Sequence, residues 1–210
     1  MTNPDARTAI EIYVHQVRWT QTRLIEVGAA ALEVRSATTD VDLLITCEHM
    51  ALQLRSALEC LAYATLATNR AAYLAARPDG DKDWNARRIL RDIEAVNPNF
   101  YPWPFTIRMD TTGSHLDNAD NHHLTRDAFV EAYEASSDLL HAPSPFRAQI
   151  DYRAKAIQFE KWANLTTALL INHVVELPGH GFVIAYIEPK TAVCHAQLAE
   201  PFGGTYVIRK

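Results

Sequence analysis

The chain has 210 residues, 48% of them hydrophobic and only seven of them glycine, and its formal net charge at pH 7 is −5. This length allows one domain with a sizeable core, and the scarcity of glycine favours helices over a β-sandwich or barrel. No cluster of lysine and arginine stands out, so the general electrostatic footprint of a nucleic-acid-binding protein is missing, although a local RNA site stays open.

The sequence also argues against export and membrane insertion. Its first residues, MTNPDART, lack the basic region and hydrophobic core of a signal peptide, and no apolar stretch reaches the ~18–20 residues of a membrane span. The cysteines Cys47, Cys60 and Cys194 form no CxxC motif, which is typical of reduced thiols in the cytosol. We therefore expect a cytoplasmic protein with no membrane contact and no bound cofactor.

Two long helices are predicted for the first half of the chain. The first begins at Asn3-Pro4, an N-cap followed by a proline at the first helical position, and runs to about Ser36. The second covers residues 41–74, and Thr39 is its expected N-cap. Its apolar positions recur at spacings of three and four: Cys47, Met50, Leu54, Ala57, Leu61 and Ala64. The short link between the helices predicts an antiparallel hairpin.

One row of the second helix combines charged and apolar residues. Glu48, Leu52, Arg55 and Glu59 follow one another at spacings of four, three and four, so they share one line on the helix. The favoured interpretation is a solvated face on which Arg55 and Glu59 form an ion pair. The alternative is a partly buried functional row.

A third helix is predicted over residues 83–96, after a turn at 77–80, and Asn97-Pro98 ends it. The next segment, NPNFYPWPF at 97–105, contains too many prolines for a regular helix. Its aromatic residues either pack against the helices or line a ligand groove. The candidate groove residues are Tyr101, Trp103 and Phe105.

Residues 107–123 are predicted to form a polar loop. This loop contains a cluster of side chains that bind metals in other proteins: His115, Asp117, Asp120, His122 and His123. The spacing matches no zinc signature, and HExxH is missing. A solvated loop without a metal is therefore the favoured interpretation.

Two further helices and a small sheet complete the prediction. Thr125 caps a helix that ends near His141, and a buried helix covers residues 150–176. His141 is interpreted as a C-capping histidine or as a general acid or base. His173, on an apolar face, is interpreted as a core histidine. Strands are predicted at 182–187, 193–199 and 205–208.

The expected fold class is mainly α: a five-helix bundle built on a long antiparallel helical hairpin, with a small C-terminal antiparallel β-meander. Residues 1–177 would form the bundle, and residues 178–210 an appendage packed on it. Broad apolar helix faces and the unpaired edge of the meander predict a two-fold homodimer.

An antiparallel pair of long helices followed by shorter ones resembles the HEPN superfamily of prokaryotic helical domains. That family includes ribonuclease toxins, phage-defence effectors and non-catalytic companions of nucleotidyltransferases. Three short words also resemble those of uncharacterised bacterial proteins of similar size: RSALE at 55–59, NPNFYP at 97–102, and LLHA at 139–142 with Pro145-Phe146.

The catalytic members of the superfamily carry an arginine and a histidine a few residues apart near the start of a late helix. Here Arg108 and His115 have six residues between them but lie in the predicted loop, and Arg126 is too far from His141. The leading hypothesis is a non-catalytic HEPN-like protein that acts through protein partners in defence or a toxin–antitoxin setting. The alternative is a metal-independent ribonuclease. Its candidate residues are His141 with Arg55 or Arg147, and Glu59 is a candidate binding residue.

Overall fold

The computed structural model describes residues 4–111, 113–119, 122–141 and 150–199. In chain order the elements are α1 (Pro4–Ser36), α2 (Asp40–Ala76), the short 3₁₀ helix η1 (Gly80–Lys82), α3 (Ala86–Val96), β1 (Trp103–Asp110), β2 (Gly113–Asn118), α4 (Arg126–Leu139), α5 (Tyr152–Ile171), β3 (Asn172–Leu177), β4 (Gly181–Ile187) and β5 (Cys194–Ala199). This confirms the predicted class, a mainly α fold with a small antiparallel sheet towards the C-terminus.

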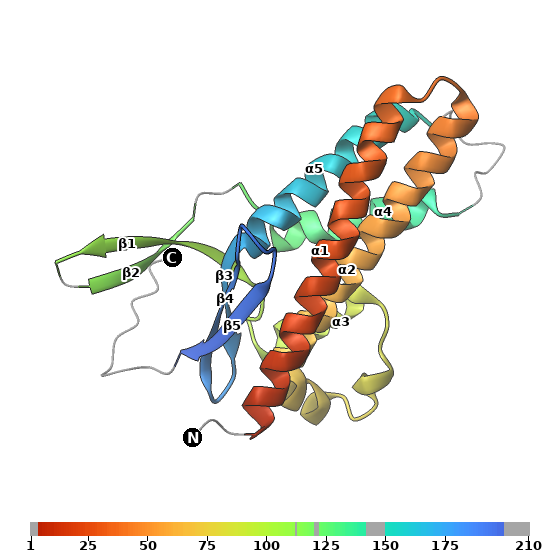
Figure 1. The fold of residues 1–210 in the computed structure, drawn as a ribbon. Helices are drawn as coiled ribbons and strands as arrows, with labels where there is room; N and C mark the ends of the chain where they lie inside the picture. Colours follow the sequence, from red (N-terminus) through yellow and green to blue (C-terminus); the bar gives the residue numbers. More distant parts are fainter. Residues whose placement is uncertain (1–3, 112, 120–121, 142–149, 200–210) are drawn as a thin grey trace.

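The hairpin of α1 and α2 is the longest part of the molecule, and the two helices lie side by side along their length (Figure 1). The backbone N–H of Asp42 donates to Oγ1 of Thr39 at 3.1 Å, so Thr39 is the N-cap of α2 as predicted. Leu54, Leu58 and Leu61 are fully buried. The apolar rhythm of α2 therefore faces the core.

The remaining helices cover the hairpin. At the start of α4, Oγ1 of Thr125 accepts from the N–H of Ala128 at 3.2 Å, which confirms the predicted cap. Leu124 and Phe129 on either side of this cap are fully buried. On α5, an ion pair between Arg35 and Glu160 at 2.6 Å joins this helix to α1. The ion pair thus ties α5 to the hairpin, whereas the cap stabilises the first turn of α4.

The predicted polar loop at 107–123 is wrong, because most of it forms the antiparallel hairpin of β1 and β2. Its register runs from Phe105 opposite Asn118 to Asp110 opposite Gly113. Thr106 and Arg108 are exposed, and Arg108 pairs across the strands with Asp117 at 2.8 Å. Strands exposed to water carry polar residues, so a polar composition did not distinguish this ribbon from a loop. The ribbon projects away from the helices (Figure 1).

The predicted fifth helix is also too long. Helix α5 ends at Ile171, and residues 172–177 form strand β3 instead of continuing the helix. His173, Val174 and Leu177 are all buried, and their spacings of one and three also fit one face of a helix over so short a stretch. Pairing with β4, from Asn172 opposite Tyr186 onwards, decides in favour of the strand.

The five strands form one antiparallel sheet in the order β2-β1-β3-β4-β5. The turn between β3 and β4 contains Gly179 with a φ of 79°, a conformation that favours glycine. This hairpin crosses the boundary expected near Pro178, so strands from both sides of that point belong to one sheet. The predicted strands at 182–187 and 193–199 are confirmed, and the one at 205–208 lies outside the described residues.

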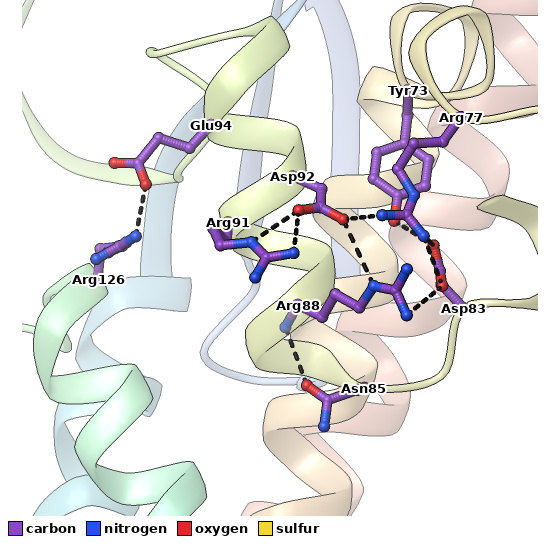
Figure 2. Close-up of polar contacts among 9 residues, drawn as sticks. All are labelled: Tyr73, Arg77, Asp83, Asn85, Arg88, Arg91, Asp92, Glu94 and Arg126. Carbon is purple, nitrogen blue, oxygen red and sulfur yellow. Dashed lines mark hydrogen bonds and ion pairs between the residues drawn. The ribbon is translucent and has the colours of Figure 1, made fainter.

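A network of ion pairs holds α3 against the end of α2 (Figure 2). Arg77 pairs with Asp83 at 3.0 Å and with Asp92, and Tyr73 donates its hydroxyl to Asp83 at 2.7 Å. Burial, followed by the hydrogen bond to Asp83, raises the pKa of Tyr73. The network fixes the helix that leads into the aromatic segment at 97–105.

A second set of ion pairs joins α3 to α4. Arg126 pairs with Glu94 at 2.5 Å (Figure 2), and Arg87 pairs with Glu134. Beneath them, Asn97 donates its side-chain amide to the buried Asn69 at 2.8 Å. The segment that follows α3 is therefore anchored to both α2 and α4.

Candidate functional site

Arg55 lies at the interface of α2 and α4. Its Nε donates to Oε1 of Glu59 at 3.0 Å, its Nη1 donates to Oγ of Ser137 at 3.1 Å, and its Nη2 lies 3.4 Å from the hydroxyl of Tyr133. The guanidinium carbon also stands 5.1 Å from the centre of the Tyr133 ring. We call these four residues the arginine cluster.

The arginine cluster is half-buried, with 24% of the Arg55 side chain and 27% of the Glu59 side chain exposed. It is therefore more enclosed than the solvated face favoured from sequence. The Tyr133 hydroxyl also donates to Glu59 at 3.3 Å. Burial, and then the charge of Glu59, raises the pKa of Tyr133, so this phenol keeps its proton. The cluster thus neutralises Arg55 and clamps α4 onto α2.

Of the two other predicted catalytic residues, His141 lies in the described part of the chain. His141 is exposed and follows Leu140, the C-cap of that helix. Ser137 stands four residues before His141, so the contact with Ser137 places Arg55 beside the last turn of α4. The described contacts of Arg55 do not include His141. Arg147 lies outside the described residues.

A cleft of about 500 Å³ opens where the aromatic segment meets the sheet. Ten described residues line it: Pro98, Asn99, Tyr101, Trp103, Pro104, Asn118, Ala119, His123, Glu176 and Phe182. We call it the aromatic cleft. Tyr101 and Trp103, two of the predicted groove residues, are part of its lining. Phe105 is not, because its side chain is buried in the interior.

Tyr101 is held in place by its hydroxyl, which donates to the carbonyl oxygen of Leu124 at 3.1 Å. Burial raises the pKa of this tyrosine. Its ring stands edge-on to that of Phe100, with the ring centres 6.0 Å apart. Phe100 itself is buried. This wall of the cleft is therefore fixed by packing and by one hydrogen bond.

Glu176 is a lining residue that no local sequence pattern indicated. It was assigned to a helix, whereas it lies on β3 directly opposite Phe182 on β4. Opposite residues in an antiparallel pair point to the same face of the sheet, and both line the cleft. Its Oε2 atom is shielded from water and has no hydrogen-bond partner in the described part of the chain. The lining includes no lysine or arginine among the described residues.

The described histidines and acids of the predicted loop do not gather into a metal site. Asp117 lies on β2 and pairs with Arg108, and His123 lines the aromatic cleft. Asp120 and the side chain of His115 are outside the described set. Within the described ranges, three or more His, Cys, Asp or Glu side chains nowhere gather as metal ligands would. The expected lack of a metal stays a prediction.

His173 is a core histidine, as predicted. It lies on β3, and its side chain is fully buried. Its Nδ1 lies 3.1 Å from the carbonyl oxygen of Leu170, so Nδ1 carries the proton. Nε2 is then an acceptor, and the hydroxyl of Tyr13 donates to it at 2.6 Å. Burial lowers the pKa of His173 to about 4, so the ring is neutral at physiological pH.

The three cysteines are free thiols. Burial raises the pKa of Cys47 to about 12 and that of Cys194 to about 11, and it also raises the pKa of Cys60. Thiols with raised pKa values are poor nucleophiles. We therefore assign them a structural role.

Comparison of the chain with protein-family models, characterised proteins and solved structures finds no match. The resemblance to the HEPN superfamily therefore stays a prediction. Among the described helices, none combines the length and the hydropathy needed to cross a membrane.

Proposed function

We propose that this protein is a non-catalytic, HEPN-like helical protein that acts through protein partners in a prokaryotic defence or toxin–antitoxin setting. The observation that carries the proposal is the state of Arg55. Its guanidinium already pairs with Glu59, donates a hydrogen bond to Ser137 and lies against the ring of Tyr133. An arginine that stabilises a transition-state phosphate must offer its charge to that phosphate. Here the charge is already compensated.

A row of apolar residues on α2 supports the binding role. Val41, Ile45 and Leu52 are 62%, 60% and 48% exposed. Their spacings of four and seven place them on one face of the helix. The row runs towards Arg55 and Glu59, which are themselves half-buried. We take a second copy of this chain as the first partner to test, since a two-fold axis brings the same face of both copies together.

Sedimentation equilibrium tests this partner. The wild type should be a dimer at micromolar concentration, and Ile45→Glu should be a monomer with an unchanged circular dichroism spectrum. Trp84→Glu is the matched control, because Trp84 is 65% exposed but lies beyond the other end of α2. It should remain dimeric. A monomeric wild type, or a dimer that persists in Ile45→Glu, removes this surface from the proposal.

The second candidate function is a metal-independent ribonuclease. One observation favours it: the bond between Arg55 and Ser137 brings the guanidinium to the last turn of α4, which His141 follows. A histidine can act as the general base and an arginine can stabilise the phosphate without a metal ion. This candidate requires Arg55 to leave Glu59.

Incubation of the purified protein with RNA separates the two candidates. A non-catalytic protein leaves the RNA intact, with or without EDTA. A ribonuclease of the proposed kind cleaves it in the presence of EDTA, and His141→Ala should then lower the rate by ~10²–10⁴-fold, the usual cost of losing a general base. Cleavage of that kind by the wild type reverses our ranking.

A further inference from the structure

The aromatic cleft has the form of a small-molecule site. Its volume of about 500 Å³ falls within the range of roughly 300–1,000 Å³ that ligand pockets occupy. One wall comes from the segment after α3 and the start of β1, with Tyr101 and Trp103, and another from β4, with Phe182. Aromatic faces carry a negative partial charge, so they attract cations.

The charged group in the cleft also favours a cation. Glu176 contributes a carboxyl group to the lining. Its Oε2 atom is both shielded from water and without a hydrogen-bond donor among the described residues. A carboxylate oxygen in that position is costly unless a donor pairs with it. No described lysine or arginine lines the cleft to supply one.

We propose that the aromatic cleft binds an organic cation bearing N–H groups, a guanidinium or a protonated amine, with Glu176 as its counter-ion and Trp103 as a face on which the cation lies. The N–H groups supply the donors that the carboxylate lacks. A guanidinium suits both walls, because it is planar, stacks on aromatic rings and offers a carboxylate two parallel N–H groups. An anion would meet the carboxylate and the aromatic faces, and no described lysine or arginine lines the cleft to compensate its charge. This site is separate from the partner surface on α2.

Isothermal titration of the purified full chain with four matched probes tests the chemistry. Butylguanidinium and butylammonium should bind saturably, with dissociation constants below roughly 10 mM. Tetramethylammonium is a cation without an N–H group and should bind at least tenfold more weakly than butylguanidinium. Butyrate should not bind. Equal binding of tetramethylammonium and butylguanidinium, or no saturable binding of either N–H cation, overturns the proposal.

Two variants assign the binding to named side chains. Glu176→Gln keeps the size of the side chain and removes its charge, and should weaken butylguanidinium binding about tenfold or more. Trp103→Leu should weaken it about threefold or more by removing the stacking face. The matched control is Glu188→Gln, at a carboxylate that directly follows β4 and is not part of the lining. It should bind like the wild type. Unchanged affinity in Glu176→Gln overturns the proposal.

A second measurement uses the wild type alone, so it does not depend on whether Trp103→Leu folds. In the wild type, the indole N–H resonance of Trp103 should shift on addition of butylguanidinium, while those of Trp19 and Trp84, which lie outside the lining, should not. Shifts at Trp19 or Trp84 with none at Trp103 would place the cation elsewhere and overturn the proposal.

A guanidinium can belong to a free small molecule or to an arginine side chain of a protein. The tripeptide Gly-Arg-Gly with blocked ends separates these sources. Binding at least tenfold tighter than that of butylguanidinium assigns the cleft to a protein arginine, and equal or weaker binding assigns it to a free cation. Both results support the proposed chemistry.

Discussion

The buried histidine on β3 makes stability depend on pH in a way that can be calculated. The pKa of His173 falls from 6.5 to about 4 on folding, because burial disfavours the charged ring. The unfolded chain therefore binds a proton between these two pH values while the folded chain does not. The resulting stabilisation is complete above pH 6.5 and is lost as the pH falls towards 4.

The magnitude follows from the size of the shift. Each pKa unit is worth about 1.4 kcal/mol, so a shift from 6.5 to about 4 corresponds to about 3 kcal/mol of unfolding free energy. His173→Gln removes the titrating group and keeps a side-chain acceptor for the hydroxyl of Tyr13. Between pH 7 and pH 4 the wild type should lose about 3 kcal/mol more than this variant.

Urea unfolding followed by circular dichroism at pH 7, 6, 5 and 4 measures this difference. The comparison uses the change of unfolding free energy with pH. A loss of stability from altered packing in His173→Gln that is the same at every pH therefore does not affect it. A control variant, His49→Gln, replaces an exposed histidine on α2 and should retain the steep wild-type loss. If the wild type and His173→Gln lose stability in parallel, the neutral, buried state of His173 is refuted.

Four substitutions test the packing. Leu58→Ala should lower the unfolding free energy by about 2–5 kcal/mol, because Leu58 is fully buried on α2. Leu52→Ala, at a residue that is 48% exposed, should lower it by less than about 1 kcal/mol. Similar losses for the two variants in thermal melts would mean that the buried face of α2 is wrongly assigned. Gly80→Ala should cost about 1–3 kcal/mol, because its Cβ would stand 2.5 Å from Cε1 of Tyr73 and displace the ring that bonds to Asp83. The contrasting variant is Gly28→Ala on α1, where an added Cβ meets no atom within 4 Å. It should raise the unfolding free energy by about 0.5–1 kcal/mol. If Gly80→Ala and Gly28→Ala both destabilise the protein, the clash with Tyr73 is not the specific cause of the loss in Gly80→Ala.

The sequence alone determined the features that depend on neighbouring residues. Thr39 and Thr125 were predicted as N-caps because an N-cap needs only its own side chain and the next backbone N–H groups. The repeat of apolar residues on α2 likewise predicted its buried face. Prolines and glycines located the ends of α2 and α3 to within a few residues. These local signals were enough to assign a mainly α fold.

Tertiary structure decided the features that depend on residues far apart in the chain. Residues 172–177 fit a helical pattern until β4 pairs with them, and the polar ribbon of β1 and β2 shows its strands only once their backbones bond to each other. The aromatic cleft follows from the same cause. Tyr101 and Trp103 were recognised from sequence as aromatic groove candidates, but Glu176 joins them only because β1, β3 and β4 share one sheet. A pattern of single residues records which side chains prefer burial, whereas the partner of each strand is set by long-range hydrogen bonds that no local pattern contains.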